Sequence, residues 1–129
     1  MPRGILTNRL RIFKRTNMDT LKELTNTILH FRDERDWKQF HDSKNLALAI
    51  SIEAAELNEL FLWKSGEESE FVDKSKIKEE LADIFAFTIL LSEKHGFDLV
   101  QITKEKFEQN AMKYPIDKAK GTSKKYDQL

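Results

Sequence analysis

Apolar positions recur with the period of an α-helix along most of the chain, and they predict four long helices. The first is expected from residue 19 or 20 to about residue 35, where Thr20 and Glu23 have capping-box spacing. The second is expected over residues 43–63. The buried stripe of the first helix would consist of Leu21, Leu24, Ile28 and Phe31.

The third predicted helix covers residues 75–95 and ends at Gly96, which suits the left-handed conformation that follows many helices. The fourth opens at Asp98 and stops before Pro115, because proline cannot continue a helix. Residues 36–41, 64–75 and 116–129 lack a helical period and are expected to be connections or tail. Candidate N-caps are Asp42 or Ser43 for the second helix and Asp73 or Ser75 for the third.

The second helix is apolar on nearly every side. One face carries Leu46, Ala49, Ile50, Leu57 and Leu60, and the opposite face carries Leu48, Ile52, Ala55 and Leu62. A domain this small has too few other elements to cover both faces, so a second copy of the chain is the simplest cover. We therefore predict an all-α, four-helix protomer with antiparallel helices that forms an obligate homodimer at least.

Two pairs of acidic residues interrupt these apolar faces. Glu53 and Glu56 lie in the apolar arc of the second helix, and Glu80 and Asp83 lie in that of the third. An ionised carboxylate is costly to remove from water unless it is paired or bound to a metal. If the two helices run antiparallel, the four carboxylates converge and repel one another, and a divalent cation would relieve that repulsion.

All-oxygen ligation favours hard ions such as Mg²⁺ or Mn²⁺. A di-iron site needs a histidine three residues after a glutamate, and none of the three histidines in the chain follows a glutamate at that spacing. Since Mg²⁺ leaves coordination positions open for phosphate oxygens, phosphoryl or nucleotidyl chemistry is indicated. The alternative is that such pairs arise by chance in helices, and that Lys76 and Glu80 form a surface ion pair.

Composition and charge narrow the class of protein. The chain has 129 residues, no cysteine, and 22 basic against 22 acidic residues, which excludes disulfides and gives no bulk attraction to nucleic-acid polymers. Its longest apolar run, residues 84–91, is far below the roughly 20 residues of a membrane span. We expect a cytoplasmic protein with a basic arm (1–18), one helical domain (19–115) and a basic tail (116–129) that is either solvated or a lid over an anion.

Several ordered motifs resemble the MazG-like nucleotide pyrophosphohydrolases, and within them the dCTP pyrophosphatase branch. The pattern is Glu-x-x-Glu at Glu53, a spacer, and Glu-x-x-Asp at Glu80. The similar segments run from about residue 20 to the C-terminus, and they also include residues 34–41, 44–46 and 124–126. Two positions depart from the pattern: Ser43 stands where relatives have proline, and Ile28 stands where mammalian relatives have histidine.

The resemblance implies a role for each matching residue. Glu53, Glu56, Glu80 and Asp83 would be the catalytic residues and would hold Mg²⁺, or Mn²⁺ as a substitute, with Glu59 supporting them. Side chains implied in substrate binding are Trp37, His41, Asn45, Trp63, Lys106, Asn110, Tyr114, Lys124, Lys125 and Tyr126. Residue types alone leave open whether Trp37 contacts a base or fills the core, and whether His41 only orients its loop.

The implied reaction is hydrolysis of a nucleoside triphosphate between its α- and β-phosphates, giving a monophosphate and pyrophosphate. The implied substrate is dCTP or a modified pyrimidine dNTP, removed to clean the nucleotide pool, and the implied assembly is a dimer or a tetramer of two dimers. The alternative is a non-catalytic helical dimerisation or regulatory module that binds a nucleotide or a protein partner.

Overall fold

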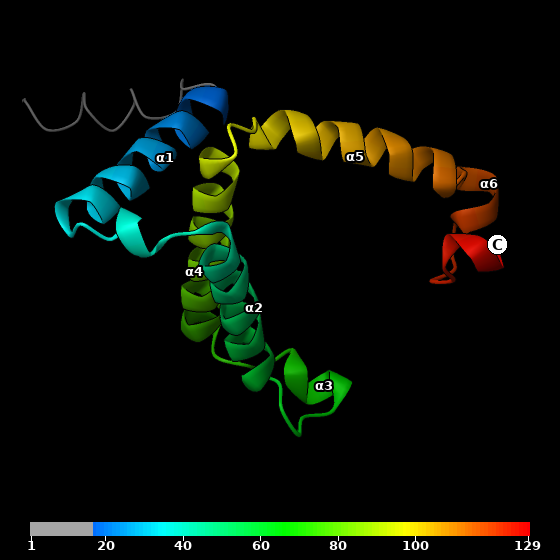
Figure 1. Cartoon of the computed structure of the whole chain (residues 1–129). Coiled ribbons are helices and arrows are strands. Elements are labelled where there is room, and N and C mark those ends of the chain that lie inside the picture. The colour runs from blue at the N-terminus through cyan, green and yellow to red at the C-terminus, as the bar shows by residue number, and fades with distance from the viewer. Residues whose placement is uncertain (1–16) are drawn as a thin grey trace, which may run out of the picture. The chain divides into compact units, whose positions relative to one another are not determined.

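The computed structural model describes residues 17–129, and every regular element among them is helical (Figure 1). This confirms the all-α prediction. The chain forms two compact units, one ending at His95 and one comprising Gly96–Leu129. The elements in chain order are α1 (Asn17–Glu34), η2 (Lys38–Phe40), α2 (Ser43–Glu59), α3 (Gly66–Ser69), α4 (Lys74–Lys94), α5 (Leu99–Lys113), α6 (Ile116–Ala119) and η3 (Tyr126–Gln128).

The first unit is built on the packing of α2 against α4. The two helices lie side by side and run in opposite directions, and α1 contacts α4 (Figure 1). Leu46 of α2 is 2% exposed, and Ile89 and Leu90 of α4 are also buried. Leu46 and Leu90 belong to the apolar faces on which the four predicted acidic ligands also lie, so the core places both acidic pairs on neighbouring helices.

Aspartates cap the N-termini of both helices of this pair. Asp42 accepts a hydrogen bond from the Asn45 amide at 2.7 Å, and Asp73 accepts one from the Ser75 amide at 2.9 Å. Each bond satisfies an amide that has no partner within its helix. Of the alternative caps at each helix, the aspartate is therefore the one used. Gly96 follows α4 with φ of 68°, as its position after the helix predicts.

Two predicted helix boundaries are wrong. α1 begins at Asn17, so Thr20 lies within the helix instead of capping it. α2 ends at Glu59 instead of residue 63, because the amides of residues 60–62 bond to carbonyls three residues earlier, which tightens the backbone into turns. Trp63 then adopts a left-handed φ of 63°, which no α-helix accommodates.

Short helices occur where no regular structure was predicted. In the segment 64–75, Ser65 and Glu68 form a reciprocal capping box that begins α3. The predicted loop 36–41 contains η2, and the predicted tail contains α6 and η3. One-turn helices such as these have no apolar period, since they are set by local hydrogen bonds, and this explains why the hydrophobic pattern missed them.

Large apolar side chains remain exposed on the single chain. In the first helix, Leu24 and Phe31 are exposed, so the prediction of a fully buried stripe is wrong for the chain alone. On the second apolar face of α2, Leu48 and Ile52 are exposed, with Ile52 at 56%, and Leu62 beyond the helix end is exposed as well. The predicted homodimer would cover that face, and it stays a prediction.

The second unit consists of α5, α6 and η3. Asp98 accepts a hydrogen bond from the Gln101 amide at 3.0 Å and so caps α5, as its position predicts. α5 ends at Lys113, two residues before Pro115. The basic arm predicted for residues 1–18 lies outside the described residues except for its last two positions, which begin α1. Within the described part of the chain, none of the helices has the length and apolar character needed to cross a membrane.

Candidate functional site

The four predicted acidic ligands lie on the packed pair α2 and α4. Glu53 and Glu56 are one turn apart on α2, and Glu80 and Asp83 are one turn apart on α4. Glu53 and Glu80 are half-buried, whereas Glu56 and Asp83 are exposed. Glu53, Glu80 and Asp83 each offer one carboxylate oxygen, and these oxygens all lie within 4.8 Å of one another. The fold thus gathers carboxylates from two helices into one acidic cluster.

Two oxygens of this acidic cluster lack any protein partner. Glu53 Oε2 and Glu80 Oε2 are buried and accept no hydrogen bond among the residues that the structure describes. A buried carboxylate oxygen without a hydrogen-bond partner is unfavourable, more so than a neutral group in the same position. Most native polar groups avoid that cost, so both oxygens indicate a ligand at this position.

The electrostatics of the acidic cluster favour the binding of a positive charge. Burial is the largest cause that raises the pKa of Glu53 to about 7, and its hydrogen bond with Glu56 and the charges of the surrounding carboxylates add to it. Burial also raises the pKa of Glu80, followed by the charge of Glu56. Glu56 lies outside the group of three but acts on both half-buried members, so it belongs to the same electrostatic unit.

The donor atoms of the acidic cluster suit a hard divalent cation. All the donors are carboxylate oxygens, and no histidine belongs to the group within the described chain. Such a set favours Mg²⁺ or Mn²⁺ over ions that prefer nitrogen or sulfur. Because the two unpartnered oxygens point to a ligand as well, the residues present fit a bound metal ion.

Glu59 is the last residue of α2 and is exposed. It does not belong to the group of three carboxylates that the structure brings together. Its predicted supporting role therefore stays a prediction.

Three ring side chains are predicted to shape a base pocket, and all three belong to the first unit: Trp37, His41 and Trp63. Trp37 is partly exposed and packs edge-on against Phe31, with ring centroids 5.8 Å apart. Trp63 is 93% exposed and has the left-handed backbone described above, a conformation that costs a bulky residue of order 1–3 kcal/mol. A strained, fully exposed tryptophan near the acidic end of α2 is a candidate contact for a ligand or a partner chain.

His41 and Asn45 flank the start of α2. The Nδ1 atom of His41 is buried without a hydrogen-bond partner in the described structure. Burial lowers the pKa of His41, and the charge of Arg32 lowers it as well. The Asn45 side chain donates to the Phe40 carbonyl at 3.1 Å, so it fixes the turn that carries His41. Contact of Asn45 with a substrate stays a prediction.

The remaining predicted substrate contacts lie in the second unit. Tyr114 and Tyr126 pack edge-on with centroids 6.1 Å apart, and the Lys113 ammonium lies 5.0 Å from the centre of the Tyr126 ring. These contacts hold the chain end against the end of α5. Lys106, Asn110, Lys124 and Lys125 belong to the same unit, and their predicted substrate roles also stay predictions.

Known proteins share both the sequence and the fold. The MazG-like family profile matches residues 48–129. The chain is 34% identical over 124 residues to dCTP pyrophosphatase 1 of Mus musculus. This alignment covers 92% of the chain and 73% of the relative. The human protein of the same name is 34% identical over 115 residues, an alignment that covers 85% of this chain and 68% of the human protein. A solved pyrophosphatase of Archaeoglobus fulgidus superposes with a TM-score of 0.72 at 38% identity, covering 74% of this chain and 93% of that one.

The helical fold, the acidic cluster and these relatives together define a nucleotide pyrophosphohydrolase. The chain belongs to the MazG-like family, whose profile matches well over half of its length. The resemblance found in the sequence motifs is thereby confirmed.

Proposed function

We propose that the chain is a Mg²⁺-dependent pyrophosphohydrolase that cleaves dCTP, or a modified pyrimidine dNTP, to the monophosphate and pyrophosphate. The observation that carries the proposal is the acidic cluster: three carboxylate oxygens within 4.8 Å, with buried, unpartnered oxygens on Glu53 and Glu80. The dCTP pyrophosphatase relatives support the choice of substrate. Removal of such nucleotides would keep the nucleotide pool clean.

In this proposal Glu53, Glu80 and Asp83 hold the metal, and Glu56 completes the charge on that face of α2. A bound Mg²⁺ would supply charge neutralisation on the polyphosphate and lower the pKa of a coordinated water. A carboxylate that is left free of the metal would orient the attacking water and accept its proton. Glu59, one turn beyond Glu56, would support the ligands from outside.

The aromatic side chains supply the proposed base recognition. Trp63 offers a fully exposed indole face beyond the acidic end of α2, and Trp37 offers a partly exposed one at the start of η2. Stacking on an aromatic ring stabilises a base without regard to its identity, so hydrogen bonds must provide the preference for a pyrimidine. We assign that role to Asn45, whose side-chain amide lies at the start of α2.

The second unit supplies proposed contacts to sugar and phosphate. Tyr114 and Tyr126 already pack together, so the chain end and the end of α5 would act as one surface. Cationic and amide groups of this unit would complete the set, namely Lys106, Asn110, Lys124 and Lys125. The proposed assembly is a homodimer, or a dimer of dimers, which would cover the exposed apolar face of α2.

Product analysis tests the proposal. The full-length chain is incubated with dCTP and millimolar Mg²⁺, and nucleotides are separated by anion-exchange chromatography. We expect dCMP and pyrophosphate in equal amounts, and no dCDP. EDTA and the Asp83→Asn variant should each remove the activity, whereas Glu70→Gln, an exposed acid after α3, should retain it. Unchanged dCTP, or release of dCDP and phosphate, would overturn the assignment.

A second series compares natural and modified nucleoside triphosphates at the same concentration. We expect the highest kcat/KM for a cytosine or modified pyrimidine deoxynucleotide, and lower values for purines. Equal rates with all bases would contradict the proposed substrate preference while leaving the metal-dependent hydrolysis intact.

A further inference from the structure

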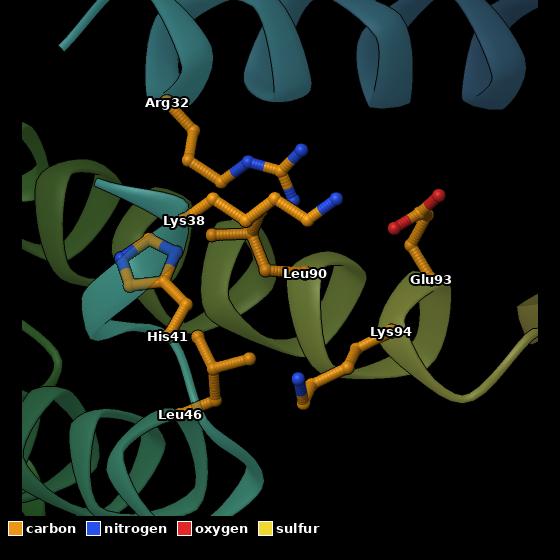
Figure 2. A pocket seen from close by; sticks show the side chains of 7 residues that line it. All are labelled: Arg32, Lys38, His41, Leu46, Leu90, Glu93 and Lys94. Atoms are coloured by element: carbon orange, nitrogen blue, oxygen red, sulfur yellow. The ribbon is translucent and has the colours of Figure 1, made fainter. Parts of the chain in front are cut away.

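A basic pocket opens in the first unit beside the core of α2 and α4. Its volume is about 300 Å³, and Leu46 and Leu90 contribute its apolar surface. Figure 2 shows Arg32 and Lys38 on one side of the pocket and Lys94 on the other, with Leu90 between them. His41 and Glu93 complete the lining. Five of the seven lining residues therefore carry a charged or ionisable head group, and three of them are the basic side chains Arg32, Lys38 and Lys94.

The charge of this basic pocket is unbalanced. Glu93 is its one acid, against three cationic side chains. Within the described structure, neither Lys38 nor Lys94 lies at ion-pair distance from a carboxylate. Arg32 pairs with Asp33 at 2.8 Å and its side chain is only 11% exposed, so this guanidinium is held in place. A fixed guanidinium beside two unpaired ammonium groups favours an anion with several oxygens.

His41 provides an independent sign of a ligand. Its Nδ1 atom is buried and has no hydrogen-bond partner among the described residues. Burial and the charge of Arg32 lower the pKa of His41, which favours the neutral imidazole. A neutral imidazole with its proton on Nδ1 can donate a hydrogen bond to an anionic oxygen. An occupant of the pocket would thus satisfy an atom that the protein leaves unsatisfied.

The basic pocket is separate from the acidic cluster. Leu46 precedes Glu53 by seven residues on α2, and Leu90 follows Asp83 by seven on α4. At 1.5 Å per residue, both separations correspond to about 10 Å along the helices. A single phosphate group cannot contact both places. The acidic cluster repels an anion unless a metal is bound, whereas the pocket attracts one directly.

We propose that the basic pocket is a second, metal-independent binding site for a phosphate group. The occupant is either free pyrophosphate or the phosphate of a nucleotide, because both present several anionic oxygens of a size that fits. Arg32, Lys38 and Lys94 neutralise the charge, and His41 donates to one oxygen. The hydrophobic pattern gave no sign of this site, since its cations come from three elements without a common spacing.

Calorimetric titration of the full-length chain with pyrophosphate in EDTA tests the proposal. We expect binding by the wild type, and binding at least tenfold weaker for the double variant Lys38→Gln/Lys94→Gln, because each lysine supplies a charge-assisted contact. Lys74→Gln, an exposed lysine at the first position of α4, is the matched control and should bind like the wild type. Circular dichroism checks that all three proteins have the same helix content.

Two results would overturn the site: no binding of pyrophosphate by the wild type at millimolar concentration, or equally tight binding by the double variant. If free pyrophosphate is the occupant, the double variant needs about tenfold more pyrophosphate for product inhibition, at unchanged KM for dCTP. If a nucleotide phosphate is the occupant, KM for dCTP rises by a similar factor. A chain that binds pyrophosphate in EDTA but hydrolyses no dNTP would keep this site and overturn the proposed function.

Discussion

Glu53 lies between an apolar helix face and three other carboxylates, and both surroundings favour its protonated form. Its Oε2 atom has no partner in the described structure, as is also true of Glu80 Oε2. In the metal-free protein these residues therefore lower the stability of the folded state, while in a metal-bound protein the same residues would be ligands. Function and stability should respond in opposite directions when one of these charges is removed.

Glu53→Gln tests this opposition. In EDTA we expect the variant to unfold at a temperature about 2–5 °C above the wild type, because one repelling charge is gone. With Mg²⁺, only the wild type should gain further stability, and dCTP turnover by the variant should fall by about 100-fold or more. Calorimetric melting with and without metal, and an assay for dCMP, provide the two readouts. A variant that melts below the wild type in EDTA would contradict the repulsion.

The raised pKa of Glu53 also predicts a pH dependence for the metal-free chain. Its folded pKa is about 7 against an ordinary value of 4.5, so between these values the folded state binds more protons than the unfolded state. Stability contributed by this group is complete below about pH 4.5 and is lost as the pH rises to 7. Urea unfolding in EDTA at several pH values should show the loss as a difference between wild type and Glu53→Gln. No difference in slope across this window would contradict the shift.

At the scale of elements, the sequence predicted the four long helices and most of their ends, but the start of α1 and the end of α2 were predicted wrongly. Apolar periodicity reports burial of a helix face, which is why it found α2 and α4 and placed both acidic pairs on them. Helix ends depend on local hydrogen bonds and on backbone angles, such as the left-handed φ of Trp63. The same limit applies to α3, whose capping box lies in a polar segment.

Asp73 caps the N-terminus of α4, the helix that carries Glu80 and Asp83, and its removal should destabilise that end of the helix. Asp73→Ala is expected to lower the melting temperature at pH 7, while Asp73→Ser, an equally good N-cap, should restore it. Hydrogen bonds from the Ser75 hydroxyl and amide lower the pKa of Asp73 below its ordinary value of 3.8. Its contribution is present above pH 3.8 and is lost as the pH falls through the folded value. An effect of Asp73→Ala that persists undiminished at pH 2 would contradict this role.

At the scale of the whole molecule, few side chains are buried: the buried apolar residues of the described chain are Leu46, Ile89 and Leu90. Two helices also carry exposed apolar stripes, Leu48 and Ile52 on α2 and Leu81 and Phe85 on α4. Exposed apolar area of this kind marks an association surface. The sequence predicted it because α2 is apolar on both sides, a property of one helix. Which surfaces meet depends on the shapes of two chains, and periodicity does not contain that information.

Ile52→Glu tests the predicted homodimer. A carboxylate at this position would be desolvated in the interface without a partner, so we expect dissociation or at least about tenfold weaker association. Sedimentation velocity should give a wild-type mass of at least two chains and a lower mass for the variant. Lys44→Glu, an exposed position at the start of α2, is the matched control and should associate like the wild type. A wild type that sediments as a single chain at micromolar concentration would rule out the predicted dimer.

The most direct measurement is a titration of the protein with Mn²⁺, followed by the electron paramagnetic resonance signal of the free ion. If Glu53, Glu80 and Asp83 hold a divalent metal, the wild type will remove free Mn²⁺ from solution, and Mg²⁺ will compete. Glu53→Gln and Asp83→Asn should each bind Mn²⁺ at least about tenfold more weakly, while Glu70→Gln binds like the wild type. Undiminished free Mn²⁺ with the wild type, or equal binding by the two cluster variants, would contradict a metal centre on α2 and α4.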